Sequence, residues 1–164
     1  MRESIGATYI FSICLTFIIL FTAYLAISLN YAKAFRIKSN IVSMIEENEG
    51  YCSNNLEQKV RDYLISEGYT ASGTCSPNIS STNSRTVDDY RLVSDGCIDI
   101  YNTGKCNACI YRRERYNNSD DIGDSNSYYK VVAFFKFDLP ILNVLTNFKV
   151  GGETKMIHEF GSCN

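Results

Sequence analysis

The sequence predicts an α+β protein in which a long N-terminal hydrophobic helix, first transmembrane and then amphipathic, packs on a small disulfide-stapled antiparallel sheet. Three features predict this class. Residues 4–32 contain no charge, apolar residues continue at helical spacing to Ile45, and residues 51–164 combine short strands with six cysteines. Helices followed by a run of strands are typical of α+β folds built around one core.

The uncharged stretch is long enough to cross a bilayer. A hydrocarbon core about 30 Å thick needs about 20 apolar residues of helix, and residues 7–29 supply them. A cleaved secretory signal is one alternative, but its apolar region has only about 7–15 residues. A permanent single-span anchor is a second alternative, and it agrees with every feature of this segment.

The helical pattern does not end at the membrane edge. Apolar residues recur at steps of three and four along one face beyond it: Ala34, Ile37, Ile41, Met44 and Ile45. No Pro or Gly interrupts residues 7–49, and Gly50 is a natural stop. We therefore expect one helix about 65 Å long, with residues 7–32 in the membrane or a filament core, residues 33–50 amphipathic, and residues 51–164 forming an extracytoplasmic head.

The segment ESIGATYIF at residues 3–11 resembles the processing site of the tight-adherence pilins and their TadE-like pseudopilin relatives. The resemblance implies that residues 1–6 are a leader and that a prepilin peptidase cuts between Gly6 and Ala7. It also implies that the apolar helix leaves the membrane to pack against other pilin-like subunits. The residues of the filament-core or membrane helix would be Ala7, Phe11, Cys14, Phe17, Phe21 and Leu25.

One position departs from the family pattern. The family usually has Glu at the fifth residue after the cut, where this chain has Phe11. That Glu is thought to pair with the neighbouring subunit's N-terminus, so its absence favours a minor or tip subunit over a major one. Residues 135–150, an aromatic strand that runs into a Leu-Pro pair, match the family only in part. The alternative function is a single-span membrane-anchored binding module on the cell surface that does not polymerise.

The two indicators of sidedness disagree. Arg2 stands alone before the span, whereas Lys33, Arg36 and Lys38 follow it, and positive charge favours the cytoplasmic side. The head cysteines favour an oxidising compartment, and a translocated domain can override a weak charge bias. We therefore expect an extracytoplasmic head with disulfides among Cys52, Cys75, Cys97, Cys106, Cys109 and Cys163, and a free Cys14.

Six cysteines allow 15 pairings, and proximity in sequence favours one of them. Cys52 with Cys75 would bracket a helix, Cys97 with Cys106 would cross a hairpin, and Cys109 with Cys163 would hold the C-terminus. A Cys₄ metal site from Cys97, Cys106, Cys109 and Cys163 is the alternative. His158 is the only histidine and no second Cys-x-x-Cys follows, so we expect no metal.

The head begins with helix and continues as strands. A helix is expected at residues 54–67, closed by Gly68, and a polar loop at residues 70–85. Strands are expected at residues 90–93, 97–101, 106–113 and 129–137, with a polar loop at 117–127. Residues 142–150 and 153–160 read as a final hairpin that turns at Gly151 and Gly152.

Catalytic patterns are absent from the sequence. There is no nucleophile elbow, zincin motif or glycine-rich phosphate loop, so neither an enzyme nor a cofactor is expected. Beyond residue 32 the chain has 15 basic and 17 acidic residues, the totals of 16 and 18 less Arg2 and Glu3. Nucleic acid is therefore not an expected partner, although Arg112, Arg113 and Arg115 form a short basic run. A calcium loop at residues 120–124 is a weaker alternative, because its spacing does not match an EF-hand.

Overall fold

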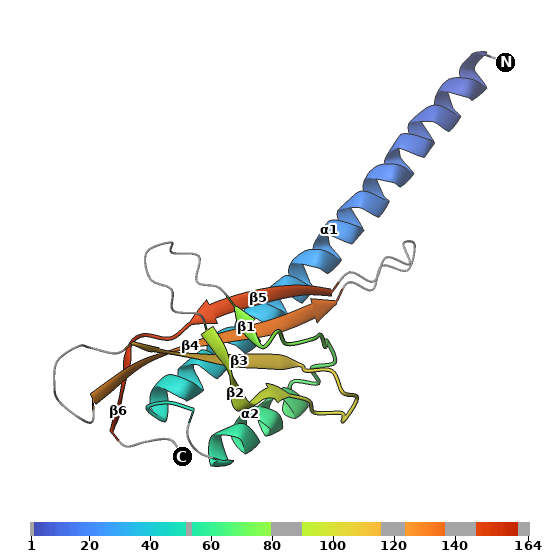
Figure 1. Cartoon of the computed structure of the whole chain (residues 1–164). Coiled ribbons are helices and arrows are strands. Elements are labelled where there is room, and N and C mark those ends of the chain that lie inside the picture. The colour runs from blue at the N-terminus through green and yellow to red at the C-terminus, as the bar shows by residue number, and fades with distance from the viewer. Residues whose placement is uncertain (1, 52–53, 80–89, 116–123, 137–146, 161–164) are drawn as a thin grey trace.

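The computed structural model describes residues 2–51, 54–79, 90–115, 124–136 and 147–160. The predicted class is confirmed: a long apolar helix leads into a head of helix and antiparallel sheet. In Figure 1 the first part of the helix stands clear of the head, and its last part lies behind the sheet.

The long helix, α1, spans Arg2–Glu47, so it begins before the expected start at Ala7. Only Gly6 weakens this extension, by about 1 kcal/mol relative to Ala. At the other end Glu49, rather than Gly50, takes the left-handed conformation with φ of 53°. The backbone N–H of Gly50 donates to the Ile45 carbonyl at 3.0 Å, and that of Glu49 donates to the Glu46 carbonyl at 3.3 Å. These two bonds close the helix as a Schellman motif.

The second helix, α2, spans Asn54–Ser66, close to its predicted bounds. Gly68, with φ of 57°, occupies the left-handed position after it. The N–H of Tyr69 donates to the Leu64 carbonyl at 3.0 Å, so the predicted glycine stop is confirmed.

The six strands that the structure describes form one antiparallel sheet, in which β1 to β5 follow one another in the order β1-β2-β3-β4-β5 and β6 pairs with β4. Their bounds are β1 Asn78–Ile79, β2 Tyr90–Ile98, β3 Ala108–Arg115, β4 Asp124–Lys136, β5 Asn147–Glu153 and β6 Ile157–Phe160. The long strand β4 pairs with β5 through its C-terminal half, where Lys136 lies opposite Asn147. Its N-terminal half pairs with β6, where Ser127 lies opposite Ile157.

The strand predictions need three corrections. Residues 124–127 belong to β4 and not to the loop expected at 117–127. The two strands expected at 90–93 and 97–101 are one strand, β2, with a register shift between Leu92 and Cys97. Gly96 is part of this irregularity, because a Cβ there would lie 2.4 Å from the Ile110 carbonyl oxygen. The prediction of a final hairpin that turns at these glycines is also wrong, because Gly151 and Gly152 lie inside β5. The last strand, β6, pairs with β4 and not with β5. Residues 142–146 lie outside the described part.

The core lies between the helices and the sheet. The amphipathic half of α1 contributes Ile37, Ile41 and Ile45, each at most 1% exposed, which confirms the predicted apolar stripe. α1 packs against β4 and β5, and α2 packs against α1 and β2. From α2 the buried side chains are Leu56, Val60 and Leu64. Full burial of such aliphatic side chains stabilises a fold by about 1.5–3 kcal/mol each.

The other face of the central strands is also covered. Val132 and Phe134 point opposite to Val131 and Ala133, yet all four are buried. The cover is part of the segment that was expected to be a polar loop. Gly73 forms a bridge with Cys106, and a Cβ at Gly73 would lie 2.3 Å from the Phe134 ring. The Tyr69 hydroxyl donates to the Phe134 carbonyl.

Candidate functional site

The first part of α1 is a fully apolar surface outside the head. The helix is long and apolar enough to cross a membrane, and none of its most apolar stretch is buried. Two of its hydroxyls are bonded within the helix, since the Thr16 hydroxyl donates to the Ser12 carbonyl at 2.9 Å and that of Thr22 to the Ile18 carbonyl at 3.0 Å. Such bonding within the helix is what a hydrocarbon environment requires.

The predicted helix residues lie on the part of α1 outside the head, and Ala7 is the one among them whose side chain is not described. Steps of three and four residues along α1 place the others on the same side, and these are exposed: Phe11, Cys14, Phe17, Phe21 and Leu25. Phe17 is 70% exposed, and Cys14 is a free thiol. This stripe is an exposed apolar surface of α1.

The predicted processing residues Gly6 and Ala7 lie in the first turns of α1. Gly6 is exposed, and no atom lies within 4 Å of where its Cβ would be. A peptide bond inside a helix must be locally unwound before a peptidase can bind it, and a helix terminus unwinds most readily. Cleavage at this position therefore needs only the end of the helix to open.

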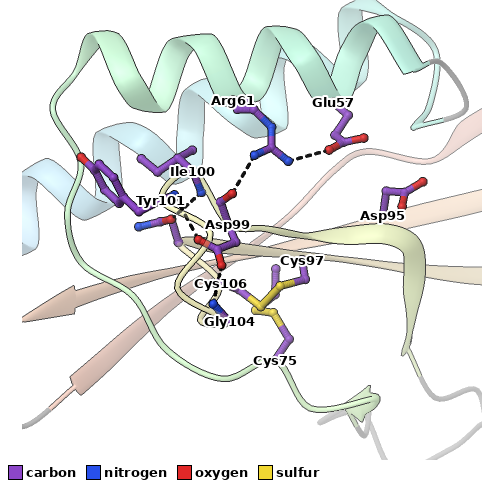
Figure 2. The surroundings of a disulfide bond; sticks show 12 residues. Glu57, Arg61, Cys75, Asp95, Cys97, Asp99, Ile100, Tyr101, Gly104 and Cys106 are labelled. Atoms are coloured by element: carbon purple, nitrogen blue, oxygen red, sulfur yellow. Dashed lines mark hydrogen bonds and ion pairs between the residues drawn. A yellow bond between two sulfur atoms is a disulfide. The ribbon is translucent and has the colours of Figure 1, made fainter.

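Within the described residues two disulfides lie at the β2–β3 hairpin, and one of them joins the sheet to the segment before it. Cys97 bonds to Cys106 across the β2–β3 hairpin, with a Cα separation of 5.1 Å. Cys75 bonds to Cys109 with a Cα separation of 5.8 Å. Figure 2 shows the sulfur atoms of Cys75, Cys97 and Cys106 close together below the hairpin.

The cysteine pairing corrects two of the three predicted bonds. Cys97–Cys106 is confirmed, but Cys75 pairs with Cys109 and not with Cys52. Cys109 is therefore unavailable to Cys163. The reason is the Gly73–Cys106 bridge, in which the two backbones exchange hydrogen bonds of 2.8 and 2.9 Å. The bridge brings residue 75 beside β3. Cys52 and Cys163 lie outside the described residues.

The same sulfur cluster bears on the metal alternative. The Sγ atoms of Cys75, Cys97 and Cys106 all lie within 4.8 Å of one another. A zinc ion that binds thiolates at about 2.3 Å requires its sulfur ligands to lie about as close to one another as these three Sγ atoms do. Disulfide bonding occupies these sulfurs in the structure, so only a reduced protein would present them as ligands.

A buried asparagine, Asn107, organises the hairpin that carries the cysteines. It is 1% exposed. Its side-chain amide donates to the Ala71 carbonyl at 2.8 Å, and its side-chain oxygen accepts from the Ile100 N–H at 3.1 Å. These bonds fix both the hairpin and the segment that leads to Cys75. The sequence gives no signal for this role, because the partners are distant backbone groups.

Asp99 organises the turn of the same hairpin. Its carboxylate accepts from the N–H groups of Tyr101 at 3.1 Å and Gly104 at 2.7 Å. Burial acts to raise the pKa of Asp99, but these bonds and those from Thr103 and Asn102 outweigh it and lower the pKa. Arg61 of α2 donates to the Asp99 carbonyl at 2.6 Å, which Figure 2 also shows. Asp99 is thus a turn-forming residue, and its carboxylate is already bonded.

We expect Asn107→Ala to lower the free energy of unfolding of the head by about 2 kcal/mol, because the backbone groups of Ala71 and Ile100 lose buried partners. Denaturant unfolding of the full chain in detergent micelles measures this. Asn78→Ala, at an exposed position on β1, is the matched control and should stay within about 0.5 kcal/mol. Equal effects at the two sites would contradict the role assigned to Asn107.

The arginines of the predicted basic run lie on β3 and contact the sheet. Arg112 Nε donates to Ser127 Oγ at 3.2 Å. The Arg113 guanidinium stacks over the rings of Tyr90 at 5.0 Å and Tyr128 at 4.9 Å. The Arg112 and Arg113 side chains therefore pack along their own sheet, which is a structural role.

Buried tyrosines make the head sensitive to alkaline pH. Burial, with the charge of Glu153 adding to it, raises the pKa of Tyr90 to about 12. Burial also raises the pKa of other tyrosines above their ordinary value: Tyr51, Tyr69 and Tyr111. A folded-state pKa above the unfolded value means that folding favours the neutral phenol. This stability is complete below pH 10 and is lost as pH rises through the folded pKa values.

We expect the free energy of unfolding to fall above pH 10, by about 1.4 kcal/mol per pH unit for each buried tyrosine. Denaturant titrations at increasing pH, with tyrosinate absorbance recorded in parallel, test this in a Cys14→Ser background that avoids thiol exchange. Tyr69→Phe should show a shallower fall. An unfolding free energy that stays constant through this range would contradict the burial of these hydroxyls.

Comparison with protein-family models, curated proteins and solved structures finds no match to this chain.

Proposed function

We propose that this chain is a pilin-like assembly subunit, a minor pilin or TadE-like pseudopilin of a bacterial surface filament that is held in the membrane before assembly. The division of α1 carries the proposal. One continuous helix is exposed and apolar over its first part, and it buries Ile37, Ile41 and Ile45 in the head over its last part. Such a subunit can exchange lipid for neighbouring helices without rearranging its head.

The disulfide pairs support an extracytoplasmic position for the head. Stable disulfides form in oxidising compartments and are rare in the cytosol, and the described head contains two. The cations Lys33, Arg36 and Lys38 after the span act in the opposite direction. A folded domain on the translocated side can override this bias, so the disulfides carry more weight.

Processing between Gly6 and Ala7 is the first test. N-terminal sequencing of the native protein should find a mature start at Ala7. Gly6→Leu should leave the chain uncut by a co-expressed prepilin peptidase, whereas Ser4→Ala should leave cleavage unchanged. A native chain that retains its first six residues, or a wild-type chain that the peptidase leaves uncut, contradicts the pilin-like assignment and favours the anchored binding module.

Subunit contact along the helix is the second test. Cys14 is a free thiol within the exposed stripe, so a short bismaleimide should join Cys14 of two subunits in assembled material. Cys14→Ser is the matched control and should remain monomeric on a denaturing gel. Assembled filaments whose subunits stay unlinked would place this face away from the subunit contact. A chain that enters no assembled material and stays monomeric under all conditions would favour the binding module.

A further inference from the structure

The two described disulfides share one sulfur cluster. The hairpin disulfide joins Cys97 to Cys106, and the segment disulfide joins Cys75, in the segment before the sheet, to Cys109. The Sγ atoms of Cys75, Cys97 and Cys106 nevertheless all lie within 4.8 Å of one another, and Figure 2 shows these three side chains meeting at one point. Each disulfide therefore has a sulfur of the other disulfide as a close neighbour.

The four cysteines differ in their access to solvent. Cys97 is exposed and Cys75 is half-buried, whereas Cys106 is 6% exposed and Cys109 is 0% exposed. A thiolate attacks a disulfide at a sulfur that it can reach, and the other sulfur of the bond leaves. A thiol in solution should therefore attack Cys97 first, and the sulfur that leaves is that of Cys106.

Backbone contacts hold the cluster together independently of both disulfides. Gly73 and Cys106 exchange two hydrogen bonds, of 2.8 and 2.9 Å. The buried side-chain amide of Asn107 donates to the Ala71 carbonyl at 2.8 Å. These three bonds keep the segment that carries Cys75 beside Cys106 when the hairpin disulfide opens. A reactive group that is held close to its target acts at a high effective concentration.

We infer that the two disulfides form a relay for thiol–disulfide exchange, in which a low-molecular-weight thiol modifies Cys97 and Cys106 then attacks Cys75. In the first step the thiolate of the small molecule bonds to Cys97 Sγ, the hairpin disulfide breaks, and Cys106 Sγ leaves as a thiolate. In the second step the Cys106 thiolate bonds to Cys75 Sγ and the segment disulfide breaks. The sulfur that leaves is Cys109 Sγ.

The two steps together neither gain nor lose electrons. Two disulfide bonds are present before them and two after them, namely the mixed disulfide at Cys97 and a new Cys75–Cys106 bond. The proton of the small thiol ends on Cys109. The new bond lies beside the Gly73–Cys106 bridge, so the segment remains over the sheet. The relay thus converts modification of an exposed cysteine into a free thiol at a buried one, and it is independent of the proposed function.

Glutathione is the probe for the first test. The full chain in detergent micelles, with Cys14→Ser to remove the free thiol of α1, would be treated with glutathione, quenched with acid and labelled with N-ethylmaleimide in denaturant. Tandem mass spectrometry without reduction then maps the bonds. We expect molecules with glutathione on Cys97 to carry maleimide on Cys109 and a Cys75–Cys106 link.

Three results of this mapping would overturn the inference. Glutathione on Cys75 beside an intact hairpin disulfide would place the entry site elsewhere. Maleimide on Cys106 beside an intact segment disulfide would show that exchange stops after the first step. A chain that glutathione leaves unmodified would show that Cys97 is not a site of modification.

Two double variants measure how much of the exchange passes through the hairpin disulfide. Cys97→Ala with Cys106→Ala leaves the segment disulfide alone, and glutathione should open it at least about tenfold more slowly than in the parent chain. Loss of the hairpin disulfide destabilises the head and would speed opening, so unfolding cannot cause this decrease. In the matched control, Cys75→Ala with Cys109→Ala, glutathione should modify Cys97 and leave Cys106 as a free thiol. An undiminished rate in the first variant would contradict the relay.

The single variant Cys97→Ala tests the second step without any added thiol. It leaves Cys106 as a thiol close to Cys75 Sγ. Incubation at about pH 8.5, where a cysteine thiolate is populated, should therefore produce a Cys75–Cys106 link and a Cys109 thiol that maleimide labels. A variant that keeps its segment disulfide and is labelled at Cys106 would overturn the relay, whatever the stability of the head.

Discussion

Replacing Cys75 and Cys109 together with alanine should lower the free energy of unfolding of the head by about 3–4 kcal/mol, the largest effect expected for any disulfide described in this chain. The bond closes a loop with a sequence separation of 34, and in the chain-entropy model the stabilisation grows with loop length. The Cys97–Cys106 bond, with a separation of 9, should contribute about 2–3 kcal/mol. The longer loop also fixes residues 71–75 over the sheet.

Denaturant unfolding of the two double-alanine variants under oxidising conditions measures the order of these effects. The Cys97→Ala and Cys106→Ala pair is the matched control, since it removes the neighbouring bond from the same cluster. A larger loss for the shorter loop would show that native-state packing, and not loop closure, dominates. Thiol labelling of the denatured, unreduced wild type should find Cys14 as the free thiol. Finding the head cysteines free, or bound to zinc, would contradict the disulfide assignment.

Ile41→Ala should lower the free energy of unfolding by about 3 kcal/mol, within the range of about 2–5 kcal/mol for buried isoleucine truncation. Ile41 is fully buried in the core, on the part of α1 that packs against the sheet. The cost combines lost burial with the cavity left behind. Because the same helix carries the apolar span, the variant should also weaken the attachment of the head to α1.

Ile65→Ala on α2 is the matched control, because the same side chain is there 53% exposed. Its effect should remain within about 0.5 kcal/mol. Denaturant unfolding gives the stability, and limited proteolysis after residue 47 reports whether the head separates from the helix. Similar losses at both positions would contradict the placement of the amphipathic half of α1 in the core.

Periodicity in the sequence was sufficient to predict the helix. The charge-free run and the apolar steps to Ile45 are local patterns, and a helix depends mainly on hydrogen bonds between near neighbours. The same applies to α2, whose end at Gly68 follows from local backbone geometry. The small error at the end of α1 also has a local cause, since Glu49 takes the left-handed position just before Gly50.

Strand partners and two disulfides depended on contacts that no local pattern contains. Gly151 and Gly152 are typical turn residues, yet they lie within β5. At Gly152 a Cβ would meet the flexible end of the Lys38 side chain at 2.5 Å, so this position lies against a helix more than 100 residues away in the chain. Cys75 likewise pairs with Cys109 because the Gly73–Cys106 bridge brings their segments together.

The sequence by itself determined the class of this protein: a charge-free helix long enough to cross a membrane, continued by an apolar stripe, and a cysteine-bearing antiparallel head. These properties are set by composition and by spacing along the chain. Only the tertiary structure decided which cysteines pair, which segment covers the second face of the sheet, and that Tyr31, Phe135 and Phe148 meet where the helix leaves the head. Packing between distant segments sets these features, and sequence spacing does not encode it.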